Sequence, residues 1–154
     1  MMMPIAEMRE FAGFAPAEQR YIKRSLDIGL ARTDAFRRWG RSEGENIAIR
    51  RQYVAYQDLK ALRGLIPQDD TPGEVERFLG KLVRIAAFDL EQERLVSFSA
   101  FRFLYERLLG ARARPYLPAA FCAASALPSI APQRRKLLLQ SSIDVEAFVQ
   151  RDLA

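Results

Sequence analysis

A cluster of basic side chains in the first third of the chain is the clearest chemical signal in the sequence. Residues 20–51 hold nine Lys or Arg and four Asp or Glu, a local excess of +5. Such groups neutralise phosphates and release their counterions, and the planar guanidinium of Arg contacts a phosphate through two donors. We therefore predict a non-specific, phosphate-contacting face for nucleic acid, with the candidate residues Arg20, Lys23, Arg24, Arg37, Arg38, Arg41, Arg50 and Arg51.

Aromatic residues lie among these basic side chains and leave two interpretations open. Exposed rings can stack on nucleobases, and the region offers Tyr21, Trp39, Tyr53 and Tyr56 for that role. The alternative is that the rings belong to the core and the Lys and Arg side chains form an ordinary solvated face. Arg outnumbers Lys 20 to 4, which either phosphate recognition or the codon bias of a GC-rich genome explains.

The order of residues 20–38 is similar to a helix-turn-helix, whose second helix enters the major groove of DNA. Ile28, Gly29 and Leu30 fit the turn, but Phe36 and Trp39 come one residue later than the pattern requires. We therefore expect contacts to phosphates and infer no reading of base sequence. The sequence does not distinguish DNA from RNA.

Residues that usually carry catalysis or bind metals are sparse. The chain has no histidine, and its one cysteine, Cys122, lies among Ala and Phe residues, where a packed core thiol is expected. The acidic pairs Asp69–Asp70 and Glu91–Glu93 lack the spacing of a calcium loop. No phosphate-cradling glycine loop and no G-x-S-x-G elbow is present. The sequence therefore predicts a non-enzymatic protein without metal or cofactor.

The stretch 95–109, LVSFSAFRFLYERLL, predicts a central helix around which the other elements pack. Its apolar residues recur at helical spacing and cover much of the circumference, so several neighbours must shield it. They are Leu95, Val96, Phe98, Phe101, Phe103, Leu104, Tyr105, Leu108 and Leu109. Gly110 then provides a residue type that ends helices. Because residues 95–100 also alternate along the chain, a short strand there is the alternative.

Capping signals and amphipathic spacing predict further helices on both sides of this stretch. Ser42 with Glu45, and Thr71 with Glu74, have the spacing of capping boxes, and Pro72 suits a first helical position. The helices are expected over residues 17–30, 34–39, 43–63, 72–90, 118–127, 132–140 and 142–153. Residues 1–15 are expected to be loosely ordered, and residues 16–154 to form one all-α domain, a compact bundle of about six to eight helices.

The same periodicity predicts which side chains form the core. The buried set is expected to include Leu26, Trp39, Leu59, Leu62, Phe78, Leu82, Phe98, Phe101, Leu104 and Leu108. A chain of 154 residues is long enough to bury such a core without disulfides or metals.

A helical protein–protein interaction or assembly subunit is the second functional hypothesis. Net charge is +4 over residues 1–66, −3 over 67–100 and +4 over 101–154. An acidic middle between two basic ends can pair with a neighbouring copy, and the Pro-rich segment 111–132 can present an apolar contact. A homo-oligomer and a component of a larger complex are both open.

Composition also predicts the compartment. Residues 1–14 lack the continuous apolar run of a secretory signal, and the longest uncharged run, 115–133, holds four prolines. We therefore expect a soluble, cytoplasmic protein with no membrane association.

Overall fold

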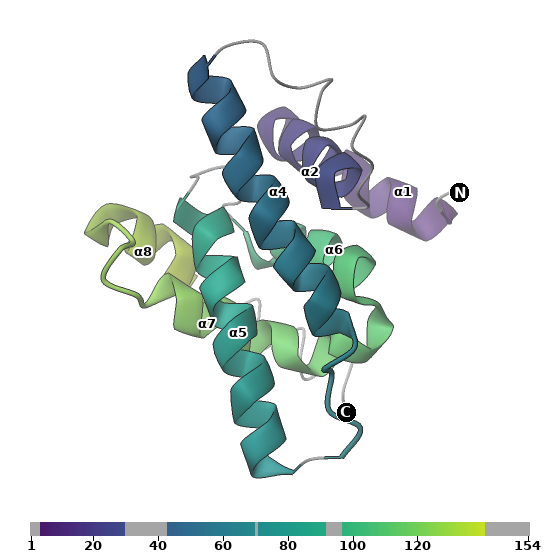
Figure 1. Cartoon of the computed structure of the whole chain (residues 1–154). Helices are drawn as coiled ribbons and strands as arrows, with labels where there is room; N and C mark the ends of the chain where they lie inside the picture. The colour runs from purple at the N-terminus through teal and green to yellow at the C-terminus, as the bar shows by residue number, and fades with distance from the viewer. Residues whose placement is uncertain (1–3, 30–42, 70, 92–96, 141–154) are drawn as a thin grey trace.

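In the computed structural model, the described residues, 4–29, 43–69, 71–91 and 97–140, form helices and their connections, without a strand. The α-helices are α1 (Ile5–Ala12), α2 (Pro16–Gly29), α4 (Glu43–Arg63), α5 (Pro72–Glu91), α6 (Phe98–Leu109), α7 (Leu117–Ser125) and α8 (Pro132–Gln140) (Figure 1). A 3₁₀-helix, η1 (Ala111–Tyr116), joins α6 to α7. The predicted all-α bundle of six to eight helices is confirmed.

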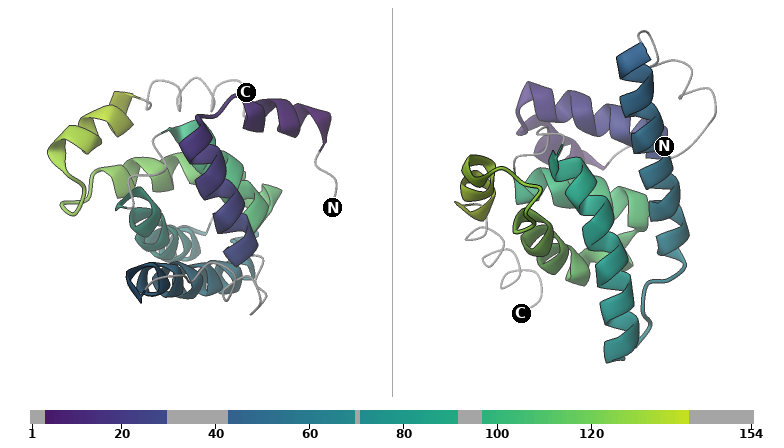
Figure 2. Two further views of the ribbon diagram at one scale, coloured as in Figure 1. Left: turned by 90° about the horizontal axis from the view of Figure 1, so that it is seen from above. Right: turned by 60° about the vertical axis from the view of Figure 1, so that its left-hand side comes forward.

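Helix α6 lies at the centre of the bundle, as its sequence predicted. Eight of its 12 residues are buried. It packs against α2, α4, η1 and α7, so that neighbours shield it on several sides (Figures 1 and 2). A helix that is apolar over most of its circumference requires this environment.

The start of α6 decides between the helix and strand alternatives for residues 97–100. Ser97 has an extended backbone, and its hydroxyl accepts a hydrogen bond from the amide of Ala100 at 3.2 Å. This is an N-cap, so residues 98–100 are helical and the strand alternative is wrong there. Residues 95 and 96 lie outside the described part of the chain. Gly110 follows the helix with φ 97°, a conformation that favours glycine.

Helices α4 and α5 form an antiparallel pair on the front of the molecule in Figure 1. Both helices lie where the sequence predicted them. The amides of Glu74 and Val75 bond to the carbonyl of Thr71, next to Pro72 at the first helical position. Helix α5 extends to Glu91, one residue beyond the predicted end. Helix α5 also packs against α7, which joins the pair to the rest of the bundle.

Helix α1 lies within residues 1–15, the segment for which the sequence predicted little order. None of its residues is buried. It is held against α6 by the ion pairs Glu7–Arg107 and Glu10–Arg102, and by Phe11, whose ring lies 5.6 Å from that of Phe103. Partners about 90 residues away order this segment, which explains why local sequence predicted little order.

The observed core matches most of the predicted one. Leu59, Leu62, Phe78, Leu82, Phe98, Phe101, Leu104 and Leu108 are buried. Leu26 is half-buried against the core, so its prediction was wrong. Cys122 is likewise half-buried against the core and less enclosed than expected. Trp39 and the helices predicted over residues 34–39 and 142–153 lie outside the described residues.

Replacing the N-cap of α6 tests this account of the fold. Ser97→Ala removes the acceptor for the Ala100 amide and is expected to lower the free energy of unfolding by about 1 kcal/mol. Ser99→Ala, at an exposed position in the same helix, is the matched control and should be neutral or slightly stabilising, because alanine favours helices. Urea denaturation followed by circular dichroism measures both. Equal effects of the two substitutions would contradict the cap.

Candidate functional site

The structure describes some of the predicted basic residues and not others. Arg20 and Lys23 on α2 and Arg51 on α4 are exposed, whereas Arg24 on α2 is half-buried. Arg37, Arg38 and Arg41 lie outside the described residues, as does the side chain of Arg50, although its backbone is part of α4. The contiguous phosphate-binding face therefore stays a prediction.

Two of these basic side chains lie against aromatic rings of the fold. The ammonium group of Lys23 is 5.5 Å from the ring centre of Phe11. The guanidinium of Arg24 is 5.2 Å from the ring centre of Tyr21. Both distances are typical of cation–π contacts, so these side chains also take part in packing.

The expectation that Tyr21 and Tyr56 can stack on nucleobases is wrong. Their exposed fractions are 2% and 0%, and both belong to the core. Trp39 and the side chain of Tyr53 are outside the described residues. The alternative interpretation, in which these rings are core, therefore holds for both described tyrosines.

The hydroxyls of these tyrosines meet a carboxylate at the centre of the molecule. Asp89 on α5 is fully buried. Tyr21 on α2 and Tyr105 on α6 each donate a hydrogen bond of 2.6 Å to it, and Tyr56 on α4 donates one of 2.9 Å. The two distances of 2.6 Å are those of strong, charge-assisted hydrogen bonds, and the bond from Tyr56 is of ordinary length. We call these four residues the Asp89 cluster.

A second row of polar groups extends the Asp89 cluster toward α2. The amide nitrogen of buried Gln52 donates to the hydroxyl of Ser25 at 2.8 Å and to that of Tyr56 at 3.3 Å. Tyr56 therefore accepts from one side and donates to Asp89 on the other. A buried network in which each group has a partner holds its helices in one arrangement.

Burial dominates the electrostatics of the Asp89 cluster. It raises the pKa of Asp89 above its ordinary value of 3.8, although the three tyrosine hydroxyls and the charge of Arg24 act in the opposite direction. Because this pKa is raised, the contribution of Asp89 to stability decreases as pH rises from 3.8 through the folded-state value. Burial, reinforced by the charge of Asp89, also raises the pKa of Tyr21, Tyr56 and Tyr105 well above 10.0.

The Asp89 cluster positions helices and does not face solvent. Each of its members is at most 2% exposed, so a substrate has no contact with the carboxylate in this structure. Sequence reasoning missed Asp89, but a signal was present. It follows Ala86 by three residues and Ile85 by four, so it lies on the buried stripe of α5. A carboxylate on such a stripe requires buried donors nearby.

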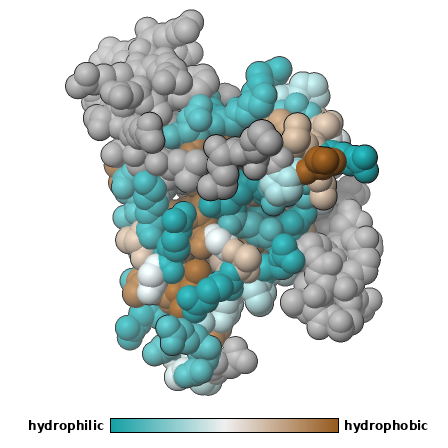
Figure 3. Space-filling view, turned by 90° about the vertical axis from the view of Figure 1, so that its right-hand side faces the viewer, coloured by the Kyte–Doolittle hydropathy of each residue, from teal (hydrophilic) through white to brown (hydrophobic). Residues whose placement is uncertain are grey.

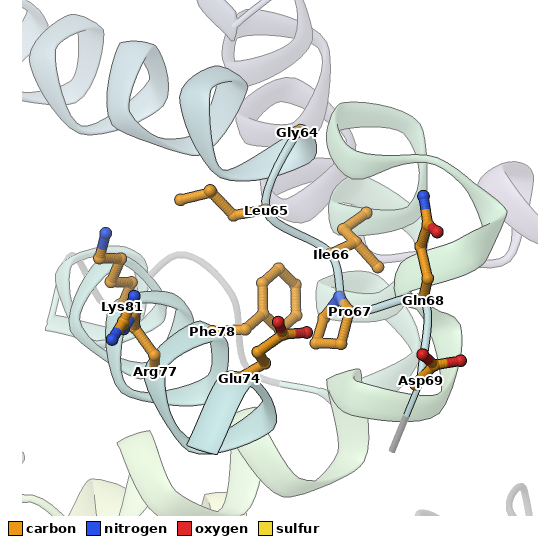
Figure 4. A pocket seen from close by; sticks show the side chains of 10 residues that line it. All are labelled: Gly64, Leu65, Ile66, Pro67, Gln68, Asp69, Glu74, Arg77, Phe78 and Lys81. Atoms are coloured by element: carbon orange, nitrogen blue, oxygen red, sulfur yellow. The ribbon is translucent and has the colours of Figure 1, made fainter. Parts of the chain in front are cut away.

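Solvent-accessible hollows lie instead along the outer surface between α4 and α5. One, of about 390 Å³, lies beside the connection between the helices. Figure 4 shows Phe78 in its middle, with Leu65 and Pro67 on one side and Arg77 and Lys81 of α5 on the other.

The neighbouring hollows continue this feature along both helices. A hollow of about 250 Å³ shares Leu65 and Lys81 with the first, and one of about 430 Å³ shares Asp58 with the second. Together they form a groove from Arg51 and Phe88 at one end to Leu65 and Phe78 at the other. We call it the α4/α5 groove. No local sequence pattern predicts this groove, because it depends on how two helices pair.

Comparison with known proteins does not assign the chain to a family: no family model, curated protein or solved structure matches it. Within the described residues, no three Cys, Asp or Glu side chains are grouped so as to hold a metal ion. None of the described helices combines the length and apolar character that crossing a bilayer requires. The groove and the charges around it are therefore the features of the surface that bear on function.

The Asp89 cluster predicts an unusual alkaline titration. Since the folded-state pKa values of Tyr21, Tyr56 and Tyr105 are raised, their stabilising contribution is complete below about pH 10 and is lost above it. We expect three of the five tyrosines to ionise only as the chain unfolds. Phenolate absorbance and circular dichroism, recorded on the same samples, measure the two events.

Two variants serve as controls for this titration. Tyr105→Phe should lower the number of late-ionising tyrosines to two. Tyr116→Phe should leave it at three, because the ring of Tyr116 packs on Phe78, away from the Asp89 cluster. Ionisation of all the tyrosines near pH 10 with helix content intact would contradict the cluster.

Proposed function

We propose that this chain is a helical protein-interaction domain and that the α4/α5 groove binds its partner. The exposed apolar side chains beside the groove carry this proposal. Val54 and Leu65 are 60% and 50% exposed, and both line it. Large apolar side chains flanking a hollow of this kind are typical of helix-in-groove recognition.

Large apolar side chains are exposed at a few places on the described surface and not over all of it. Figure 3 shows one face on which hydrophilic side chains cover most of the described area and apolar ones are exposed in small patches. Elsewhere in the described residues, Ile5 and Met8 on α1 are the other large exposed apolar side chains, at 71% and 56%. They lie on a helix with no buried residue and line none of the groove hollows.

Rigidity under the groove also favours binding. Tyr56 on α4 and Asp89 on α5 are joined by a hydrogen bond in the core directly behind the pair. Two helices fixed relative to each other need little reordering when a ligand binds between them, which reduces the entropic penalty of association. This interaction role is non-enzymatic, and a cytoplasmic location stays a prediction from the sequence.

Selection from a display library of random helical peptides tests the proposal. We expect groove-binding peptides to be enriched on the parent protein and to lose at least about tenfold in affinity on a Val54→Gln, Leu65→Gln variant, because two apolar contacts are removed. The Ile5→Gln, Met8→Gln variant is the control with equally exposed apolar residues, and it should bind the same peptides unchanged. Failure to enrich any peptide, or equal loss in both variants, would contradict the proposal.

Nucleic-acid binding through the basic region 20–51 is the second candidate, supported by the exposure of Arg20, Lys23 and Arg51. If it operates, a labelled duplex or single strand binds with an affinity that falls steeply with salt. An Arg37→Ala, Arg38→Ala variant then binds more weakly, whereas Arg112→Ala, at an exposed site on η1, has no effect. Fluorescence anisotropy at several salt concentrations measures this. Undetectable binding at low salt would remove this function.

A further inference from the structure

We infer that the segment bound in the α4/α5 groove is an acidic amphipathic helix of a partner protein, its carboxylates facing α5 and its apolar face against α4. This inference rests on the proposed function and specifies the chemistry of its partner. Three features of the groove carry it: the basic residues on its α5 edge, the charges on its α4 edge and its apolar floor.

The edge of the groove on α5 holds three basic side chains in succession, which follow the acidic Glu74 at the end of the groove near Asp69. Arg77, Lys81 and Arg84 are all exposed and line the hollows. Their spacing of four and three residues places them on one face of the helix, spread over roughly 10 Å along its axis. A second helix lying alongside presents carboxylates at the same interval when they are spaced i, i+4 and i+7.

The opposite edge, on α4, sets the orientation of the ligand. Arg51 stands at one end of it and Asp58 near its middle. A carboxylate on this edge meets the like charge of Asp58, whereas a carboxylate on the other edge meets Lys81 or Arg84. Along the stretch beside Asp58, the groove therefore favours a helix whose acidic residues lie on the edge facing α5.

Between these edges the floor of the groove is apolar. It is formed by Ala55 and Leu62 from α4 and by Ile85 and Phe88 from α5. From Arg51 to Leu62 the groove follows α4 for roughly 16 Å, which corresponds to about three turns of a bound helix. Apolar residues at i, i+4 and i+7 of the ligand then cover the floor.

The charged and apolar parts contribute differently to binding. The apolar contacts supply most of the affinity, since they remove carbon surface from water. Solvent-exposed ion pairs are individually weak, but they accelerate association and discriminate between partners. The inference therefore predicts a preference for carboxylates that high salt reduces.

Matched synthetic peptides test this inference. Each is about 18 residues long, because shorter isolated helices are marginal in water, and carries Leu at the floor-facing positions. One has Glu along the edge meant for α5, the second has Gln there, and the third has the same Glu residues moved to the opposite edge. By fluorescence anisotropy at low salt, the first should bind roughly tenfold more tightly than the other two, and at high salt the difference should shrink.

Charge-reversal variants identify the groups responsible. Lys81→Glu combined with Arg84→Glu should abolish the preference for the first peptide and favour a peptide with Lys along that edge. Arg112→Glu with Lys136→Glu makes the same charge change at exposed sites on η1 and α8 and should leave the preference intact. Circular dichroism checks folding, and Lys81→Gln with Arg84→Gln replaces the reversal if it unfolds the chain.

The outcomes separate this inference from the proposed function. Equal affinity for the Glu and Gln peptides, while library peptides still depend on Val54 and Leu65, overturns the acidic partner and leaves the interaction role standing. No binding of any peptide, combined with an empty library selection, overturns both. Binding of a DNA or RNA duplex that requires Lys81 and Arg84 but not Val54 and Leu65 assigns the basic edge to phosphates and also overturns the inference.

Discussion

A carboxylate at the centre of a helical bundle is the constraint on which the remaining packing depends. Asp89 has no exposed surface, and a charge in such a place is tolerated only where donors surround it. Its donors come from three other helices, so α2, α4 and α6 must each bring a tyrosine hydroxyl to one point on α5. Apolar burial has no direction, whereas hydrogen bonds fix distance and angle. The Asp89 cluster therefore selects one arrangement among those that bury the same carbon surface.

The same constraint connects the core to the surface. Helices α4 and α5 meet the Asp89 cluster on their inner faces and form the α4/α5 groove on their outer faces. A hydrogen bond between Tyr56 and Asp89 therefore joins the two helices that line the groove, and both residues are buried where a bound partner does not touch them. A binding surface built from two rigid helices keeps its shape without the partner, unlike one built from loops.

Local patterns were sufficient to predict most of the fold. Helix α5 was predicted from Thr71 and Pro72 at its start and from the apolar stripe that follows them. Both signals are local, because caps and periodicity act over a few residues. The Asp89 cluster joins residues 16 to 68 positions apart, and no local pattern encodes such a contact. The groove was missed for the same reason. In the basic region the sequence predicted contacts that the fold does not allow. Tyr21 and Tyr56 lie near basic residues in the sequence, but their side chains are buried in the core.

Helix α1 binds the surface of α6 as an intramolecular ligand would. It contacts α6 through Glu7, Glu10 and Phe11 and buries no residue completely. The short connection to α2 keeps its local concentration on the order of millimolar, so an outside segment must compete with that concentration to reach Phe103. Dissolved salt screens the two ion pairs but not the ring contact. Higher ionic strength therefore weakens the attachment of α1, while the buried Asp89 cluster, shielded from dissolved ions, keeps α2, α4, α5 and α6 together.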